Sequence, residues 1–248
     1  MLKWSGMTID QIIREYLSAL RFVVNDASRD PGFETNHLLS YLAQDLIESA
    51  IAITLLASQG ALRPAKRELR FVIESSVKIC YVQQKTYSSL ITDKVSQFDK
   101  ALSSPSISIK RDLAIDLVPQ ELQDPFSEEI GRLYGETSGY VHLTPRQIVE
   151  RIAAVDAGRT VGYESPQDAT DLGRLISRGF AASLALLLHS VPQYVAGDWL
   201  VDSDGSTINS YFVGSRFIAG IDSFFDYKHE RQDMLANIKA ARARRVTF

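Results

Sequence analysis

The apolar residues of this chain recur every three or four positions through most of its length, which is the spacing of an amphipathic helix. This spacing follows the capping box Thr8-Ile-Asp-Gln11, runs through 38–56, and returns after the capping box Ser165-Pro-Gln-Asp168. Few segments alternate apolar and polar residues, and no strand–helix–strand spacing occurs. The sequence therefore predicts an all-α fold.

Capping and turn signals divide the chain into a helical bundle with additional C-terminal helices. Pro64, Pro125 and Pro145 each fit the first turn of an expected helix. The expected helices cover 9–28, 36–59, 64–87, 88–102, 110–117, 125–142, 145–157, 166–188 and 218–243. We expect a loop over 103–108, an extended connection over 158–164 and a turn over 202–206. The chain is expected to form a single domain, 1–248, with a core bundle (1–157) and a C-terminal helical region (158–248).

Composition places the chain among ordinary globular proteins. The apolar fraction is 45% and the charged fraction 23%, which is enough apolar surface for a core. A net charge of −3 gives no global electrostatic case for nucleic-acid binding. The single cysteine, Cys80, lies in an apolar helical pattern and is expected to be buried. The N-terminus lacks an apolar signal region, and the apolar run 180–191 is too short to cross a bilayer, so we expect a cytoplasmic protein without a membrane partner.

One stretch, Tyr134-Gly-Glu-Thr-Ser-Gly-Tyr-Val-His-Leu-Thr-Pro145, ends one helical pattern and begins another. Tyr134, Ser138 and His142 lie four residues apart and project from one side of a helix. A neighbouring stripe without side chains consists of Gly131, Gly135 and Gly139. Because glycine destabilises a helix by roughly 1 kcal/mol relative to alanine, we expect a compensating gain. The stripe predicts close packing against a second helix.

The helix over 64–87 carries a second polar stripe, formed by Arg67, Arg70, Glu74, Lys78 and Tyr81. Arg70 and Glu74 can pair, because they lie four residues apart. If this stripe faces Tyr134, Ser138 and His142, the two helices form a network of arginine, carboxylate, hydroxyl and imidazole. The polar groups of such a network either hydrogen-bond to one another and set the helix register, or recognise a ligand or partner, or support catalysis.

The other histidines show no metal-binding pattern. His37 is expected on the exposed first turn of the helix over 36–59, His189 in the core, and His229 on a solvated face. None has a metal-binding companion four residues on, and the turn 202–206 lacks the glutamate of a calcium loop, so neither a metal nor a cofactor is expected.

The C-terminal segment is basic. It holds Lys239, Arg242, Arg244 and Arg245, with no acidic residue after Asp233. Such a tail either contacts phosphate or is a frayed and solvated terminus, and the sequence favours the solvated terminus.

The segment Arg-Glu-Leu-Arg-Phe-Val-Ile-Glu (67–74), with the later Tyr-x-x-x-Ser-x-x-x-His (134–142) and its capped turn, resembles a family of uncharacterised prokaryotic helical proteins. That family is similar in turn to the broad HEPN class, and the resemblance covers 36–152. HEPN domains often act as metal-independent ribonucleases, in dimers that bring together two Arg-x(4–6)-His motifs. This chain departs from the motif, since nine residues separate Arg132 from His142.

We therefore expect a HEPN-like interaction or regulatory module, in prokaryotic stress or defence or as a toxin–antitoxin component, acting with a protein partner or as a homodimer. The alternative is a ribonuclease that cleaves RNA, with His142 as general acid or base, Arg67 and Arg70 on phosphate, and Glu74 orienting them. A second alternative is a small-ligand (nucleotide) sensor. For ligand binding the expected residues are Tyr134, Ser138 and Tyr81.

Overall fold

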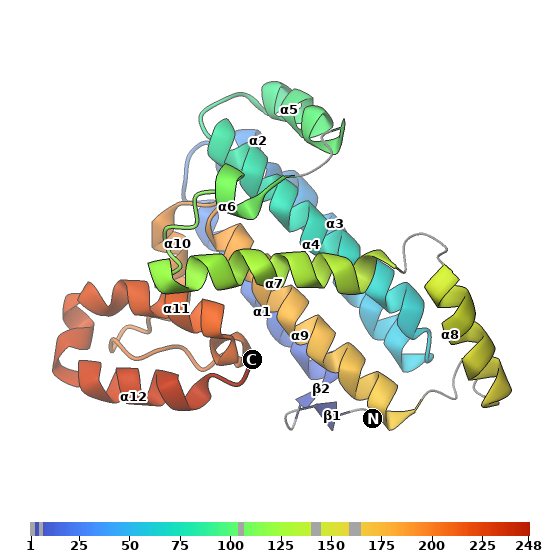
Figure 1. The fold of residues 1–248 in the computed structure, drawn as a ribbon. Coiled ribbons are helices and arrows are strands. Elements are labelled where there is room, and N and C mark those ends of the chain that lie inside the picture. Colours follow the sequence, from blue (N-terminus) through green and yellow to red (C-terminus); the bar gives the residue numbers. More distant parts are fainter. Residues whose placement is uncertain (1–2, 5–6, 104–106, 140–144, 159–164) are drawn as a thin grey trace.

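The chain forms a bundle of helices in a computed structural model, which describes all residues except 1–2, 5–6, 104–106, 140–144 and 159–164 (Figure 1). Within the described residues the strands are two short pieces, β1 (Lys3–Trp4) and β2 (Met7–Thr8), which pair antiparallel. The predicted all-α fold is confirmed.

Four long helices make the centre of the bundle: α1 (Ile9–Ala27), α3 (Leu38–Ser58), α4 (Leu62–Lys85) and α9 (Pro166–Leu188). Helix α4 packs against α3 and α9, and α1 packs against the same two helices. A buried polar contact joins three of them. The Ser183 hydroxyl lies 2.9 Å from the hydroxyl of Tyr16 and 2.7 Å from that of Ser76. These hydroxyls satisfy one another, so the polar groups fix the helix register inside an apolar core.

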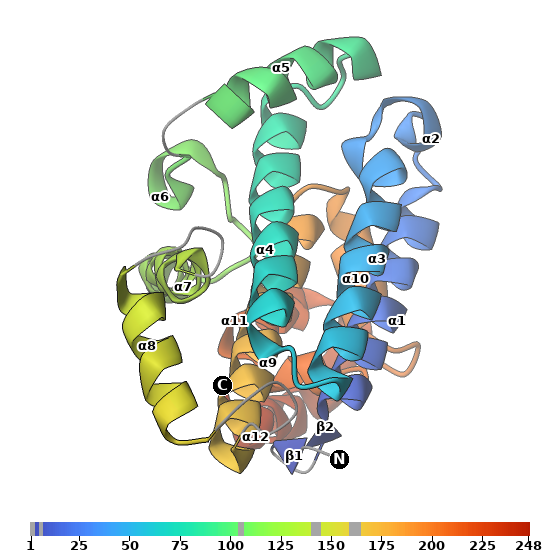
Figure 2. The same cartoon turned by 90° about the vertical axis from the view of Figure 1, so that its right-hand side faces the viewer.

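Helix α7 (Gln120–Ser138) runs across this centre and contacts both α4 and α9 (Figure 1). Its buried side consists of Phe126, Glu129, Ile130, Leu133 and Thr137. An arginine of α9, Arg178, donates to Glu129 at 2.5 Å and to Glu136 at 3.1 Å. Helix α8 (Pro145–Asp156) follows α7 and stands beside the bundle (Figure 2).

Short elements cover the two ends of the bundle. One end carries α2 (Phe33–Asn36), α5 (Ile91–Ser103) and α6 (Ile109–Asp112). The C-terminal part consists of α10 (Gln193–Leu200), η1 (Tyr211–Gly214), α11 (Arg216–Phe224), η2 (Phe225–Tyr227), η3 (His229–Met234) and α12 (Leu235–Arg245). The prediction of a single helix over 218–243 is therefore wrong, because the 3-10 helices η2 and η3 separate α11 from α12.

Two helix starts also differ from the sequence prediction. Helix α3 is capped by the His37 ring, whose Nδ1 accepts from the amide of Leu39 at 3.0 Å, so it begins at Leu38 and not at residue 36. Helix α7 begins at Gln120 after an extended Pro119, so Pro125 lies inside the helix. By contrast, the capping boxes at Thr8 and Ser165 are confirmed. The capped turn predicted around Thr144 and most of the connection 158–164 lie outside the described residues.

The predicted packing along the glycine stripe is wrong. A Cβ atom added to Gly131, Gly135 or Gly139 would meet no atom of the described residues within 4 Å. The reason is the orientation of α7: Leu133 and Thr137 face the bundle, and the glycines lie on the opposite side.

Helix α3 has the length and composition of a membrane span, with a mean hydropathy of 1.3 over its most apolar window. It is the one such helix in the described part of the chain. The same properties suit a helix in the centre of a bundle, where α3 packs against α1 and α4.

Candidate functional site

The predicted polar stripes of α4 and α7 face each other. The Arg70 guanidinium donates through one nitrogen to the backbone oxygen of Tyr134 at 3.1 Å and to the hydroxyl of Ser138 at 2.9 Å. Its carbon lies 3.7 Å from the centre of the Tyr134 ring, which is cation–π geometry. Through Nε, Arg70 also donates to Glu74 at 3.2 Å. Four of the seven predicted site residues are thus brought together.

Glu74 lies between two cations. Its other carboxylate oxygen accepts from Lys78 Nζ at 2.5 Å. Burial opposes ionisation of this carboxyl group, but the bonds and charges of Lys78 and Arg70 outweigh burial and lower its pKa. Glu74 is therefore an anion that orients Arg70 from within its own helix.

The remaining three predicted residues do not join this network in the described structure. Arg67 is exposed on α4, one turn before Arg70. Tyr81 lies two turns beyond Glu74, where its ring is 5.6 Å from Lys85 Nζ. His142 lies outside the described residues, so its role as general acid or base stays a prediction.

The chemistry open to this arrangement is limited by the commitments of Arg70. Three of its contacts go to protein acceptors, and an aromatic ring covers one face. These bonds use Nε and Nη1 of a group that has five N–H donors. In this structure Arg70 joins α4 to α7.

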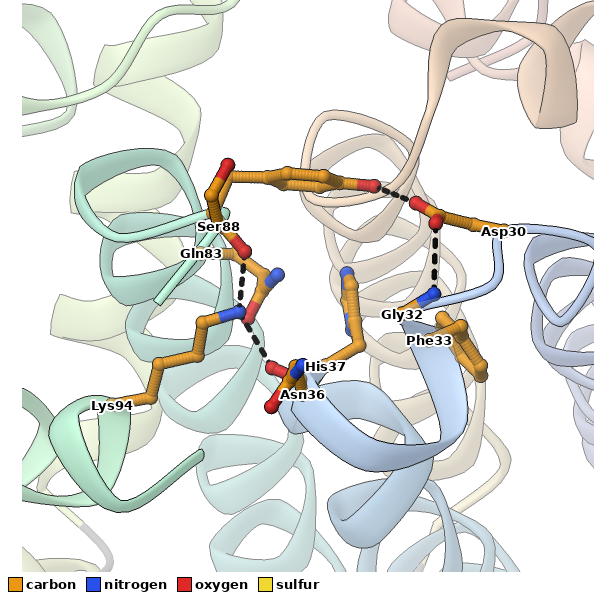
Figure 3. Close-up of a pocket in the computed structure, with 9 residues that line it drawn as sticks. Asp30, Gly32, Phe33, Asn36, His37, Gln83, Ser88 and Lys94 are labelled. Carbon is orange, nitrogen blue, oxygen red and sulfur yellow. Dashed lines mark hydrogen bonds between the residues drawn. The ribbon is translucent and has the colours of Figure 1, made fainter. Parts of the chain in front are cut away.

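A second polar cluster, which the sequence analysis missed, lies at the end of the bundle (Figure 3). It surrounds a cavity of about 210 Å³ lined by Asp30, Gly32, Phe33, Asn36, His37, Gln83, Tyr87, Ser88 and Lys94. Lys94 has no exposed surface, and His37 is 2% exposed.

The expectation of an exposed His37 is therefore wrong. Its Nε2 bonds to the backbone oxygen of Ser190 at 2.8 Å, and Ser190 is 153 residues away in sequence. The contact with Ser190 marks this site, and no sequence motif does.

His37 is held as a neutral imidazole. Its Nδ1 accepts from Leu39, so Nε2 carries the proton and donates to Ser190. Burial lowers its pKa to about 4, and the nearby Lys94 charge acts in the same direction. His189 is partly buried, and burial lowers its pKa, whereas His229 is exposed as expected.

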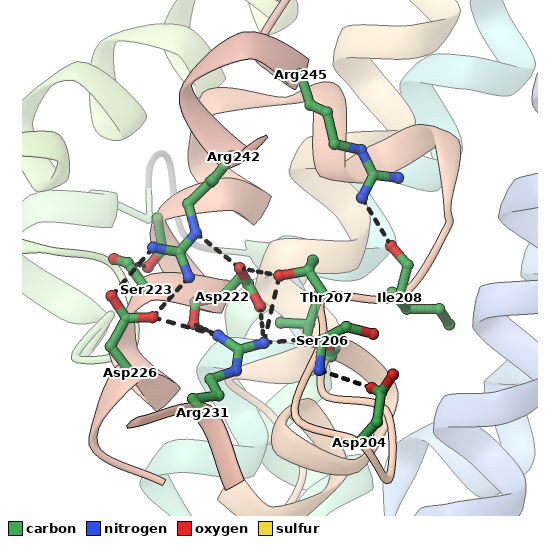
Figure 4. Close-up of polar contacts among 12 residues, drawn as sticks. Asp204, Ser206, Thr207, Ile208, Asp222, Ser223, Asp226, Arg231, Arg242 and Arg245 are labelled. Atoms are coloured by element: carbon green, nitrogen blue, oxygen red, sulfur yellow. Dashed lines mark hydrogen bonds and ion pairs between the residues drawn. The ribbon is translucent and has the colours of Figure 1, made fainter. Parts of the chain in front are cut away.

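A third cluster joins the C-terminal helices (Figure 4). Asp222 and Arg231 have no exposed surface and pair at 2.6 Å. Arg242 bonds to Asp222 at 2.7 Å and to Asp226 at 2.7 Å. The prediction of a solvated basic tail is wrong for Arg242 and for Arg245, which donates to the backbone oxygen of Ile208 at 3.1 Å. Two acids balance two bases here, so the cluster holds the C-terminal segment in place.

Helix α8 turns its apolar side to solvent. Its four large apolar residues are 48 to 66% exposed: Ile148, Val149, Ile152 and Val155. Its polar side faces the bundle, where Gln147 is buried and Glu150 lies 3.8 Å from Arg63 of α4. An amphipathic helix normally packs the other way round.

The fold and these clusters define an all-α bundle with a joined α4–α7 pair, a cavity at one end and an outward-facing apolar side on α8. In comparisons with protein-family models, curated proteins and solved structures, nothing matches this chain.

Proposed function

We propose that this protein is a helical interaction module that forms a homodimer through the outward face of α8. The observation that carries the proposal is the reversed orientation of that helix, with its polar side on the bundle and its apolar side in solvent. Contiguous exposed apolar residues mark interaction surfaces in soluble proteins. The resemblance to HEPN domains, which act in dimers, supports the same conclusion.

The spacing of the exposed residues suits pairing with a second copy. With Ile152 at heptad position a, both Ile148 and Val155 fall at d, which is the seam of a coiled coil. The positions that face the bundle, taken by Gln147 and Glu150, are c and f, on the far side of the helix from the seam.

Charge on the two flanks of the seam sets the orientation of the pair. Arg151 occupies position g and Asp156 the following position e, and both are exposed. In a parallel two-stranded pair, residue g of one helix meets the following e of the other. Arg151 of each copy therefore faces Asp156 of the other, so the flanks are complementary when two α8 helices pair in parallel.

The test measures mass by light scattering across a wide range of protein concentration. We expect a monomer–dimer equilibrium for the wild-type protein, and a monomer for Ile152→Glu, which puts a charge in the seam. Ala153→Glu is the matched control, because Ala153 is exposed on the same helix at position b. It should dimerise like the wild type.

The flanking charges supply a second, independent readout. Arg151→Asp and Asp156→Arg should each weaken the dimer, since each places like charges opposite one another, and the double variant should restore it. A wild-type protein that stays monomeric at the highest concentration, or equal behaviour of Ile152→Glu and Ala153→Glu, would refute the proposal. Failure of the double variant to recover would refute the parallel orientation.

A further inference from the structure

The cavity at the end of the bundle is built from segments that are distant in sequence (Figure 3). The turn after α1 supplies Asp30, α2 supplies Phe33, the end of α4 supplies Gln83, and α5 supplies Lys94. Its volume of about 210 Å³ is below the roughly 300–1,000 Å³ of sites for drug-sized ligands. A ligand of only a few heavy atoms fits such a space, whereas a nucleotide does not.

Lys94 is a buried cation without an anionic partner. Its Nζ donates to the backbone oxygens of Asn36 at 2.5 Å and Tyr87 at 2.7 Å, and among the described residues it forms no ion pair with a carboxylate. Burial lowers the pKa of this amine, and Asp30 acts in the opposite direction from a distance. An ammonium group has three N–H donors, so one remains beyond the two carbonyl bonds. A buried, unpaired cation favours an anion beside it.

Gln83 supplies a second donor on the cavity wall. The residue is 1% exposed, and its Oε1 accepts from the backbone amide of Leu38 at 3.3 Å, which fixes the orientation of the side-chain amide. Within the described part of the chain, its Nε2 has no hydrogen-bond partner. Figure 3 shows this nitrogen turned toward the cavity. An amide nitrogen on a cavity wall gains from an acceptor brought by a ligand.

The other polar groups of the cavity are already committed. Asp30 accepts from the Tyr87 hydroxyl at 2.5 Å and from the amide of Gly32 at 3.1 Å, and the Tyr87 bond in particular lowers its pKa. It is therefore an anion, on the side of the cavity opposite Lys94 in Figure 3. His37 uses both ring nitrogens and stays neutral. The donors thus gather at one end and a negative charge lies at the other.

We propose that this cavity binds a small monocarboxylate, with one carboxylate oxygen on Lys94 Nζ and the other on Gln83 Nε2. The Phe33 and His37 rings then cover the short alkyl part of the ligand. A dicarboxylate is excluded, because its second charge would lie toward Asp30, where like charges repel.

The test titrates the wild-type protein with propionate, propionamide and succinate while its ¹H–¹⁵N spectrum is recorded, with sodium chloride added to hold the ionic strength equal. Propionate should shift the side-chain amide signals of Gln83 in a saturable way, in about the millimolar range expected for so few atoms. Propionamide has nearly the same shape without the charge and should bind at least about tenfold more weakly, as should succinate.

Substitutions locate the site. Lys94→Met should abolish the propionate response, whereas Lys100→Met, an exposed lysine of the same helix, should leave it unchanged. Lys94→Arg keeps the positive charge and should retain part of the response, which guards against a loss of folding in the Met variant. The proposal is overturned if propionate and propionamide act alike on the wild-type protein, if neither acts, or if a folded Lys94→Met variant still binds propionate as the wild type does.

Discussion

The central carbon of the Arg70 guanidinium lies 3.7 Å from the centre of the Tyr134 ring, and the same guanidinium donates to the backbone oxygen of Tyr134 at 3.1 Å. One side chain of α4 thus holds both the ring and the backbone of α7. Because helix α7 ends only four residues later, this contact fixes the end of α7 from which α8 follows. The first prediction concerns this contact.

Arg70→Met should lower the free energy of unfolding by about 2 kcal/mol, since it removes charge-assisted hydrogen bonds to α7 and leaves Glu74 with one cation. Tyr134→Leu should cost about 1 kcal/mol, and the double variant should show a coupling of about 0.5–1 kcal/mol. Urea unfolding of the four proteins measures the cycle. Tyr134→Phe keeps the ring and is the control. Additive single effects would mean that the two side chains do not interact.

The buried ion pair of the C-terminal helices supports a second prediction. Arg231→Met should destabilise the protein by about 3–5 kcal/mol, because Asp222 would stay buried with only Arg242 as its cation. Arg244→Met alters an exposed arginine of α12 and should change stability by less than about 0.5 kcal/mol. Thermal and urea unfolding compare them. Similar small losses in both variants would show that the pair contributes little.

Local features of the fold were predictable from the sequence, and distant pairings were not. The capping boxes at Thr8 and Ser165 involve residues three apart, so the sequence contains both partners. The two polar stripes at helical spacing made the facing of Arg70 and Ser138 one possible arrangement, and the structure has this arrangement.

The burial of His37 illustrates the opposite case. Its partner, Ser190, lies 153 residues away, and nothing near His37 in sequence signals that contact. The same holds for Lys94, whose carbonyl partner Asn36 is 58 residues away. A helical pattern shows which residues share a face, but it does not show which helix covers that face. The cavity was missed for this reason.

The pH dependence of stability follows from His37. Burial lowers its pKa from 6.5 to about 4 in the folded protein, so between these values the unfolded chain binds a proton that the folded chain does not. Stability should therefore fall as the pH drops from about 7 to about 4, and this histidine accounts for at most about 3 kcal/mol of the loss. His37→Gln should flatten the dependence measured by urea unfolding. His229→Gln alters an exposed histidine and should leave it unchanged. An unaltered slope in the His37 variant would contradict the assignment.

The exposed glycines of α7 give the last prediction. Within the described part of the chain no atom lies within 4 Å of a Cβ added at Gly131 or Gly135, and both have helical backbone, so alanine fits at either position. Each change should stabilise the protein by about 0.5–1 kcal/mol, because alanine loses less backbone entropy than glycine when the helix forms. Gly205 is the contrasting control: its φ is +84°, and a Cβ there would lie 2.2 Å from the backbone oxygen of Glu230, so Gly205→Ala should be strongly destabilising. Urea unfolding at low protein concentration reports the effect on the monomer. If Gly131→Ala and Gly135→Ala are instead destabilising, another segment must lie against this face of α7, as the glycine stripe first suggested.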